Sequence, residues 1–318
     1  MCDPKTTVFE AAKNNGILIE HSCLKARCRS CCVKVISGIT QDKLDDLVLT
    51  TDERSQGFVL SCNAIPTSDL VLDVEDLGGV HIFEKKIIPA KIQSINKLND
   101  TVIEVSLRLP PNANFVYHSG QYVNITKDQI RRSYSIANAY EGNTTLVFFI
   151  KKYENGLMSN YWFHEAKVND LLRIEGPIGS FFLRESQMEN IVFLATGTGV
   201  APIKAILESL NLHDKVQQNK KFWLINGARY KKDIFWNPKR LGALSNFNYI
   251  PVLSRATENW NGEKGYVQDI LLKQSVDLSN SQVYACGSNV MIESAKKILL
   301  VNGLHNNHFF SDVFTATN

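Results

Sequence analysis

Four cysteines in the first fifth of the chain have the spacing of a metal centre. Cys23, Cys28 and Cys31 follow the pattern C-x4-C-x2-C, and Cys62 comes about thirty residues later. This is the plant-type arrangement for a [2Fe–2S] cluster, in which a short loop carries three thiolates and a packed strand carries the fourth. Thiolates also suit zinc, but four-cysteine zinc sites more often show two tight C-x2-C pairs. The spacing therefore favours an iron–sulfur cluster over zinc.

A second group of residues has the chemistry expected of a flavin site. Residues 132–135 read Arg-Ser-Tyr-Ser, which supplies a guanidinium for a pyrophosphate, a ring that can stack on an isoalloxazine and a hydroxyl for its nitrogen edge. Residues 156–159 read Gly-Leu-Met-Ser and open a helix predicted over 159–165, where backbone N–H groups can hold a phosphate. A glycine-rich turn over 176–181 is expected to close this domain. The residues expected to bind FAD from the first two runs are Arg132, Tyr134, Ser135, Gly156, Met158 and Ser159.

A third group lies in a glycine loop that suits a dinucleotide. Residues 197–202 read Gly-Thr-Gly-Val-Ala-Pro, follow a buried strand predicted over 191–195 and open a helix predicted over 201–212. Glycines let the backbone approach a pyrophosphate, and a helix N-terminus attracts its charge. Arg229 follows the next predicted strand and could recognise a 2′-phosphate on the adenosine ribose. The residues expected to bind the nicotinamide nucleotide here are Gly197, Thr198, Gly199, Pro202 and Arg229.

The elements that must position these residues fall into two patterns. Between residues 88 and 183, short runs rich in β-branched and aromatic residues predict an antiparallel barrel or sandwich. These strands are expected over 90–95, 101–109, 121–125, 134–138 and 145–151. From Asn190 onward, strands expected over 191–195, 222–226, 249–254 and 282–285 alternate with helices, which predicts a parallel sheet covered by helices.

Length, composition and charge limit the classes of function. The chain has 318 residues, of which 21% are charged and 44% hydrophobic, an ordinary globular composition. A net charge of +3 gives no support for a nucleic-acid partner. The net charge changes from −4 over residues 1–80 to +7 over the rest, and residues 76–79 (Asp-Leu-Gly-Gly) indicate the start of a linker that Pro89 would end. We expect domains over 1–80, 81–185 and 186–318.

The cysteine usage and the apolar pattern indicate a compartment. The first residues show no apolar segment of the kind found in signal peptides, and the longest apolar stretches, such as 146–150, are far too short to cross a bilayer. Clustered cysteines in a reducing compartment favour a metal site over disulfides. We therefore expect a cytoplasmic protein with no membrane partner.

The chain around the cysteines resembles the plant-type ferredoxin domain of flavin-dependent reductases. The matching runs are Glu20-His21-Ser22-Cys23, residues 33–38 and Leu60-Ser61-Cys62. The resemblance implies a β-grasp fold that holds the cluster through the four cysteines. The chain departs from it at Ala26, where glycine is usual, and at Arg29, where glycine or serine is frequent; Arg29 is tolerable there if its side chain points to solvent. A strand hairpin usual before residues 7–12 is missing, which predicts either an open sheet edge or a misplaced start.

The later motifs resemble, in order and spacing, the ferredoxin–NADP reductase superfamily. The resemblance implies a six-stranded antiparallel β-barrel for FAD, followed by a Rossmann-like parallel α/β domain for NAD. Cys286 and Gly287 match a Cys-Gly pair that lies beside the nicotinamide ring, and Phe314 best fits a C-terminal aromatic that covers the flavin. The resemblance thus assigns catalytic positions to Cys286, Ser135 and Phe314. NADH-dependent members also carry arginine at the position of Arg229, so NADH is favoured and NADPH stays open.

The order of ferredoxin, FAD and NAD domains covers the whole chain and implies an electron path. NADH delivers a hydride, FAD takes up both electrons and releases them singly, and the [2Fe–2S] cluster passes on one at a time. Two groups share this order: reductase components of ring-hydroxylating or multicomponent oxygenases, and the CDP-6-deoxy-3,4-glucoseen reductases (CDP-4-dehydro-6-deoxyglucose reductases) of 3,6-dideoxyhexose synthesis. The second group is the more similar over 173–185, 199–204 and 284–314. It implies a pyridoxamine-phosphate-dependent dehydrase as electron acceptor and a role in lipopolysaccharide synthesis, whereas the first implies an oxygenase component.

A different class of protein also stays open. The chain could be a non-catalytic binding module, with a structural zinc on an inactive flavoprotein scaffold. Visible absorbance separates the two classes, because an iron–sulfur flavoprotein is brown and zinc adds no visible band.

Overall fold

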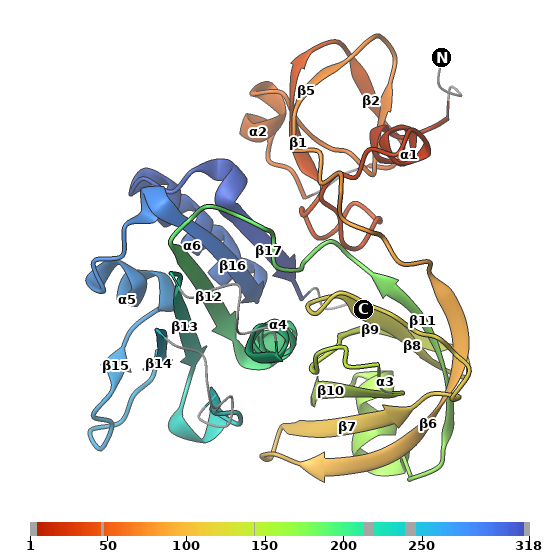
Figure 1. Ribbon diagram of the computed structural model, residues 1–318, viewed down its shortest axis with the longest axis vertical. Coiled ribbons are helices and arrows are strands. Elements are labelled where there is room, and N and C mark those ends of the chain that lie inside the picture. The colour runs from red at the N-terminus through yellow and green to blue at the C-terminus, as the bar shows by residue number, and fades with distance from the viewer. Residues whose placement is uncertain (1–4, 46–47, 143, 213–218, 239–245, 315–318) are drawn as a thin grey trace. The chain divides into compact units, whose positions relative to one another are not determined.

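The computed structural model (Figure 1) describes all residues except 1–4, 46–47, 143, 213–218, 239–245 and 315–318. Contacts between residues group the chain into two compact units. The first comprises Met1–Ile82 together with two short segments, Gly179–Phe181 and Asp312–Thr315. The second comprises Phe83–Ile178 and Phe182–Ser311.

The first unit is built on a short antiparallel sheet with two helices. Strand β1 (Cys32–Ser37) pairs with β3 (Phe58–Leu60) on one side and with β5 (Val71–Asp73) on the other, and β2 (Thr40–Asp42) pairs with β4 (Ala64–Pro66). Helices α1 (Val8–Asn14) and α2 (Thr51–Ser55) both begin with a complete capping box. The buried side chains of Val8, Phe9, Ile19 and Ala64 form the core.

The second unit begins with a six-stranded antiparallel sheet in the order β10-β7-β6-β11-β8-β9. A bridge between Ile136 and Phe148 joins the end of β9 to β10, so the sheet closes on itself and the predicted barrel is confirmed. Alternate residues point inward, because successive side chains of a strand lie on opposite faces. Ile92, Leu107, Ile125 and Phe148 are among the fully buried ones. The strands are β6 (Lys86–Lys97), β7 (Val102–Arg108), β8 (Tyr122–Lys127), β9 (Ile130–Ser135), β10 (Thr145–Lys151) and β11 (Leu171–Ile178).

Three expectations for this part of the chain were wrong in detail. Pro89 does not end a linker but lies inside β6, opposite Arg173 of β11. Because β7 pairs with β6 only from Lys91 onward, the strand has one partner at Pro89, and the fixed φ of proline suits an extended strand there. Residues 176–178 do not form a turn but complete β11, where Gly176 packs against Val123 of β8. The helix predicted over 159–165 begins at Leu157.

The remainder of the second unit is a parallel sheet with helices, as predicted. Its strand order is β15-β14-β13-β12-β16-β17, and β12 lies between β13 and β16. Helix α4 (Val200–Leu212) packs on β12 and β16, while α5 (Val267–Lys273) and α6 (Asn289–Val301) pack on each other and on the sheet. The strands are β12 (Asn190–Thr196), β13 (Lys221–Ala228), β14 (Phe247–Leu253), β15 (Glu263–Lys264), β16 (Ser281–Gly287) and β17 (Phe309–Val313).

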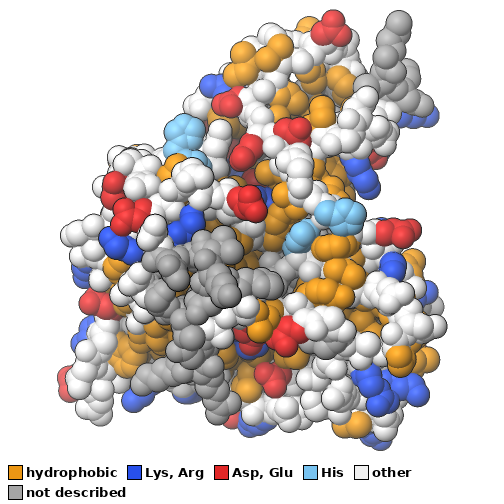
Figure 2. Space-filling model, in the orientation of Figure 1, with side chains coloured by type: hydrophobic (Ala, Val, Ile, Leu, Met, Phe, Trp, Pro, Cys, Tyr) orange, Lys and Arg blue, Asp and Glu red, His pale blue; other side chains and the backbone are white. Residues whose placement is uncertain are grey.

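Acidic and basic side chains are interspersed on the face shown in Figure 2, in keeping with a net charge of +3. Among the residues that the structure describes, no helix is long and apolar enough to cross a bilayer.

Candidate functional site

The four predicted cluster ligands lie together in the first unit as two pairs of thiols. The Sγ atoms of Cys31 and Cys62 are 3.3 Å apart, and Cys23 and Cys28 form the second pair. Backbone N–H groups point at these sulfurs: Cys23 N donates to Cys28 Sγ and Lys25 N donates to Cys23 Sγ, each at 3.3 Å. The structure thus brings a loop and a distant strand end together, as the spacing predicts.

Each thiol pair contains one sulfur that ionises easily and one that does not. The hydrogen bond from Cys28 lowers the pKa of Cys23 to about 5, and the hydrogen bond from Cys31 lowers the pKa of Cys62. The same bonds, together with burial, raise the pKa of Cys28 and of Cys31. Thiolates are the form that binds metal, so all four sulfurs would be deprotonated around a bound cluster.

This donor set fits a two-iron centre. The cysteines stand as two pairs, Cys23 with Cys28 and Cys31 with Cys62, so each pair would hold one iron of a [2Fe–2S] cluster. The N–H groups directed at the sulfurs are of the kind that tunes such a cluster.

The loop that carries three of the cysteines has an unusual backbone. Leu24, Ala26 and Arg29 have φ values of 51°, 54° and 63°, in the left-handed region that glycine adopts most easily. The resembling family usually has glycine at the position of Ala26 and often has glycine or serine at that of Arg29. The backbone therefore keeps its left-handed conformation at Ala26 and Arg29, although neither residue is the glycine that adopts this conformation most easily.

The side chain of Arg29 does not point to solvent, so the condition set for tolerating it in the loop is not met. Its guanidinium donates to the Val48 carbonyl at 2.7 Å and forms an ion pair with Glu53, leaving the side chain 17% exposed. Burial by itself would raise the pKa of Glu53, but the hydrogen bonds from Arg29 and Thr50 outweigh it and hold this pKa at about 2. The pair therefore stays charged over the whole neutral range.

The residues just before Cys23 are fixed by two distant segments of the same unit. Backbone and hydroxyl of Ser180 exchange hydrogen bonds of 2.8–3.0 Å with the backbone of His21. The hydroxyl of Ser22 donates to Asp312 Oδ1 at 3.0 Å, and both side chains are buried. The entry to the cysteine loop is thus held by residues far away in sequence, which the motif reading did not identify.

Two of the residues expected to bind FAD lie on one face of β9, next to a short helix. Arg132 and Tyr134 alternate with Ser133 and Ser135, so the serines lie on the opposite face of the strand. Tyr134 OH accepts a hydrogen bond from Trp162 Nε1 at 3.0 Å, with the two rings 6.2 Å apart and nearly perpendicular. Burial raises the pKa of Tyr134, so its hydroxyl stays protonated. The sequence reading did not identify Trp162 as its partner.

The helix beside β9 is α-helical in its first part and π-helical in its second. Helix α3 (Leu157–Asn160) packs on β9 and continues into a π-helical turn, η1 (Tyr161–Glu165), which carries Trp162. Gly156 precedes α3, and Ser159 is buried in its third position, where its hydroxyl accepts from Tyr153 N at 2.7 Å. The structure therefore brings Arg132, Tyr134, Gly156, Met158 and Ser159 onto two adjacent elements, while Ser159 already binds the preceding turn.

A cavity of about 430 Å³ opens at the start of α3. It lies between this helix and the turn that joins β8 to β9. Its lining residues are Lys127, Asp128, Ile130, Asn155, Gly156, Leu157, Asn160, Tyr161 and Glu165. The presence of Gly156 and Lys127 on its wall makes this cavity compatible with a phosphate at the predicted cradle.

The residues expected to bind nicotinamide nucleotide meet at the carboxyl edge of the parallel sheet. A Cβ on Gly199 would lie 2.2 Å from the carbonyl oxygen of Cys286, and one on Gly287 would lie 2.1 Å from Thr196 Oγ1. The glycine turn after β12 and the end of β16 are therefore in direct contact, and Thr198 and Pro202 are buried beside them. This is the edge at which ligands bind in open parallel sheets.

Arg229 lies exposed just beyond β13, at the same edge of the sheet. The carbonyl of Arg229 accepts a hydrogen bond of 3.0 Å from the backbone N of Arg255, which follows β14. Two arginines thus occupy neighbouring strand ends. The sequence reading missed Arg255, although its place directly after a predicted strand is the signal that would have found it.

The remaining predicted residues are placed differently. Cys286 is fully buried at the end of β16. Phe314 is half-buried, directly follows β17 and belongs by its contacts to the first unit. Of the nearby aromatic residues, Phe310 stacks on Tyr284 at 4.8 Å and is part of the core.

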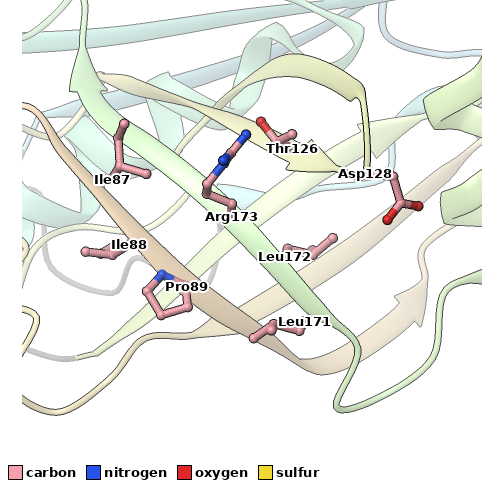
Figure 3. A pocket seen from close by; sticks show the side chains of 8 residues that line it. All are labelled: Ile87, Ile88, Pro89, Thr126, Asp128, Leu171, Leu172 and Arg173. Atoms are coloured by element: carbon pink, nitrogen blue, oxygen red, sulfur yellow. The ribbon is translucent and has the colours of Figure 1, made fainter.

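A second cavity, of about 370 Å³, lies on the outer wall of the barrel (Figure 3). Its lining comes from β6, β8 and β11 and is mostly apolar: Ile87, Ile88, Pro89, Thr126, Asp128, Leu171, Leu172 and Arg173. It contains none of the residues expected to bind a cofactor, although Asp128 also lines the cavity at the start of α3.

Comparisons with known proteins agree with this arrangement. Residues 1–67 match the 2Fe-2S iron-sulfur cluster binding domain, residues 89–183 the oxidoreductase FAD-binding domain, and residues 193–297 the oxidoreductase NAD-binding domain. The CDP-6-deoxy-L-threo-D-glycero-4-hexulose-3-dehydrase reductase of Yersinia pestis is 40% identical, over 99% of this chain and 95% of its own length. The chain belongs to this family of dehydrase reductases. It is an NAD(P)H-dependent oxidoreductase that carries an FAD-binding domain and a [2Fe–2S] domain.

More distant relatives place the family within a wider group. The reductase component of phenol 2-monooxygenase from a Pseudomonas species is 28% identical, over 97% of this chain and 89% of its own length. The crystal structure of an Amycolatopsis cytochrome P450 reductase has the same fold, with a TM-score of 0.76 at 23% identity, and covers 99% of this chain and 96% of its own. The dehydrase reductase family thus shares its fold with reductase components that pass electrons to a separate enzyme.

Proposed function

We propose that this reductase supplies electrons to a pyridoxamine-phosphate-dependent CDP-6-deoxy-hexulose 3-dehydrase. The observation that carries the proposal is the 40% identity to a reductase named for that dehydrase, which extends over 99% of the chain. The identity to an oxygenase reductase over a similar length is 28%. We therefore place the dehydrase ahead of an oxygenase component as acceptor, and the pathway in the cytoplasm, in lipopolysaccharide synthesis.

The site residues support a division of labour within the chain. We propose that Arg132, Tyr134, Gly156, Met158 and Ser159 bind FAD, with Ser135 near its ring; all six residues lie in the second unit. When bound, the cofactors supply the redox chemistry: hydride uptake from NADH, and onward transfer of single electrons. The role left to the protein is to bind, orient and shield these groups. No side chain acting as acid or base is required for the hydride step.

The nicotinamide nucleotide is proposed to bind at the carboxyl edge of β12, β13 and β16. The tight approach of Gly199 to Cys286 shapes the floor of this edge, and Gly197, Thr198 and Gly287 lie around it. Helix α4 begins at Val200, directly after the glycine turn at this edge, so its positive dipole end suits a pyrophosphate. Arg229 is placed at the adjacent strand end, where the adenosine ribose would lie.

A reconstituted assay tests the acceptor. The purified reductase, the dehydrase, NADH and the CDP-6-deoxy-4-hexulose substrate are combined under anaerobic conditions, and the deoxygenated sugar is quantified. We expect one NADH to be consumed for each 3-deoxy product, since removal of the hydroxyl as water requires two electrons. If no product forms while an oxygenase component accepts electrons from the same enzyme, the proposed acceptor is wrong.

Metal analysis tests the alternative of a zinc-bearing binding module. We expect two iron atoms and two acid-labile sulfides per chain together with one FAD, and visible bands beyond those of flavin. One zinc per chain with no sulfide would contradict the proposal, because the chain would then lack the iron–sulfur cluster that passes electrons on.

A further inference from the structure

Arg29 occupies a position in the cysteine loop where an arginine is unexpected. It lies between the ligands Cys28 and Cys31, with a φ of 63°. This left-handed conformation is unfavourable for a residue with a Cβ, so the structure around it must hold the residue there. An arginine side chain that moved freely in water would not hold the backbone in this conformation.

The side chain of Arg29 provides that hold. Its NH1 group donates to the Val48 carbonyl at 2.7 Å and to Glu53 Oε2 at 3.3 Å, while NH2 binds Glu53 Oε1. The guanidinium therefore grips the carboxylate with both arms, the geometry that gives arginine–carboxylate pairs their strength and direction. The side chains are only 17% and 28% exposed, so water screens the pair little.

Glu53 is itself fixed at the other end. It is the third residue of α2, and its carboxylate accepts from Thr50 N at 2.8 Å and from the Thr50 hydroxyl at 2.9 Å. Leu49, which directly precedes Thr50, packs in the same apolar cluster as Ala26, Cys31 and Leu60. The segment that carries Glu53 thus lies directly against the cysteine loop.

We propose that the Arg29–Glu53 pair sets the reduction potential of the cluster held by Cys23, Cys28, Cys31 and Cys62. The inference rests on the proposed presence of that cluster. Reduction adds a negative charge, so a nearby cation makes it easier and a nearby anion makes it harder. Because the pair places one of each beside the loop, the two effects oppose each other, and the potential depends on their balance.

The decisive test is a comparison of single and double variants in the intact holoenzyme. Arg29→Gly restores the residue that suits the backbone and leaves Glu53 uncompensated, so we expect the midpoint potential to shift downward. Glu53→Gln leaves Arg29 uncompensated, so we expect an upward shift. The double variant should return close to the wild-type value. The potentials are measured by redox titration, followed by visible absorbance or by EPR of the reduced cluster.

Two further variants separate charge from local structure. Arg29→Lys keeps the charge but loses the two-armed grip, and we expect a near wild-type potential with cluster release to a chelator about threefold faster. Arg54→Gln removes the arginine next to Glu53 in sequence, whose side chain binds Asp42 at 2.6 Å instead. We expect it to shift the potential clearly less than Arg29→Gly does.

The outcomes distinguish this inference from the proposed function. If both single variants move the potential in the same direction, or neither moves it, the pair does not set the potential and the inference fails alone. If wild-type protein shows no iron–sulfur bands at all, the cluster assignment fails and the proposed function fails with it. The titration needs no dehydrase, so an incorrect acceptor would leave the result unaffected.

Discussion

Lys204 Nζ lies 2.5 Å from Glu208 Oε1 one turn further along α4, and both side chains also reach the backbone that follows β9. Lys204 Nζ donates to the Ala137 carbonyl at 2.7 Å, and Glu208 Oε2 accepts from Ala139 N at 3.1 Å. The helix that opens after the glycine loop is therefore tied to the segment that continues the flavin motif. Both ties lie inside the second unit, and the sequence reading gave neither residue a role.

This double tie leads to a first prediction. Lys204→Met removes the donor to Ala137 and leaves Glu208 without its cation, so the nucleotide loop and the flavin strand should lose their fixed spacing. Since small misplacements of reacting groups are costly, we expect the rate of flavin reduction by NADH to fall about tenfold. Stopped-flow bleaching of the flavin band measures it. Lys297→Met on the exposed side of α6 serves as the control, and equal losses in both variants would contradict the prediction.

Gly199 and Gly287 should tolerate no side chain. A Cβ at either position would lie little more than 2 Å from an atom of the neighbouring strand end. We expect Gly199→Ala to lower the free energy of unfolding by about 2–3 kcal/mol, because overpacking forces backbone shifts. Thermal unfolding of the holoenzyme measures the change. Gly142→Ala is the matched control: its φ is 74°, but its Cβ would meet nothing within 4 Å, so only local strain of about 1 kcal/mol is expected there. Equal effects at the two sites would show that contact with Cys286 is unimportant.

The fourth cluster ligand allows the electron path to be cut at one end. We expect Cys62→Ser to abolish reduction of a one-electron protein acceptor, while ferricyanide reduction at the flavin continues at the wild-type rate. Both rates are measured from NADH consumption. Loss of the two activities together would show that the cluster is needed for more than onward transfer.

Two variants of Tyr134 separate the contribution of its hydroxyl to stability from the contribution of its ring to flavin binding. Tyr134→Phe keeps the ring but leaves the indole N–H of Trp162, a buried residue, without its acceptor, so we expect a loss of about 1–3 kcal/mol in unfolding free energy with FAD still bound. Tyr134→Ala should lose flavin as well. Calorimetry and the flavin-to-protein absorbance ratio check the two results. Unchanged stability of Tyr134→Phe would mean that the hydrogen bond to Trp162 contributes nothing.

The arginines at the ends of β13 and β14 address the choice of nucleotide. NADH should support the faster reaction in the wild-type enzyme. Because a 2′-phosphate would be bound by a charge-assisted contact, we expect Arg229→Ala to reduce the NADPH-supported rate about tenfold and to leave the NADH-supported rate nearly unchanged. Steady-state kinetics with both nucleotides decide it. A comparable loss with NADH would instead place Arg229 on a part that the two nucleotides share.

The sequence predicted those parts of the molecule in which local pattern and tertiary structure agree. Strand β12 contains a continuous apolar run and β16 is buried along its whole length, and the glycine loop lies between a strand and a helix in the order expected for nucleotide binding. Strand β11 was missed because Gly176 and Pro177 read as a turn, although its glycine is required by close packing on Val123 rather than by chain reversal. A structural role for Gly176 was therefore predicted correctly, but the glycine is needed for packing between strands and not for a turn.

The parts that sequence could not show are pairings between distant residues. Nothing local links Arg29 to Glu53, or Trp162 to Tyr134, because such contacts depend on how separate elements pack. The π-helical turn at Tyr161–Glu165 is equally invisible in a pattern of apolar residues. Departure from a family motif, as at Arg29, was the one signal that such a partner had to be sought.

The double use of Glu53 has a consequence for the history of this loop. The carboxylate that closes the capping box of α2 keeps enough free acceptor capacity to receive a guanidinium. An ancestor with glycine in the loop and a glutamate already at this helix start could acquire arginine in a single step, without waiting for a compensating change. Among relatives, arginine at this loop position should therefore be found almost always with glutamate at the start of α2, whereas the glutamate should also occur alone.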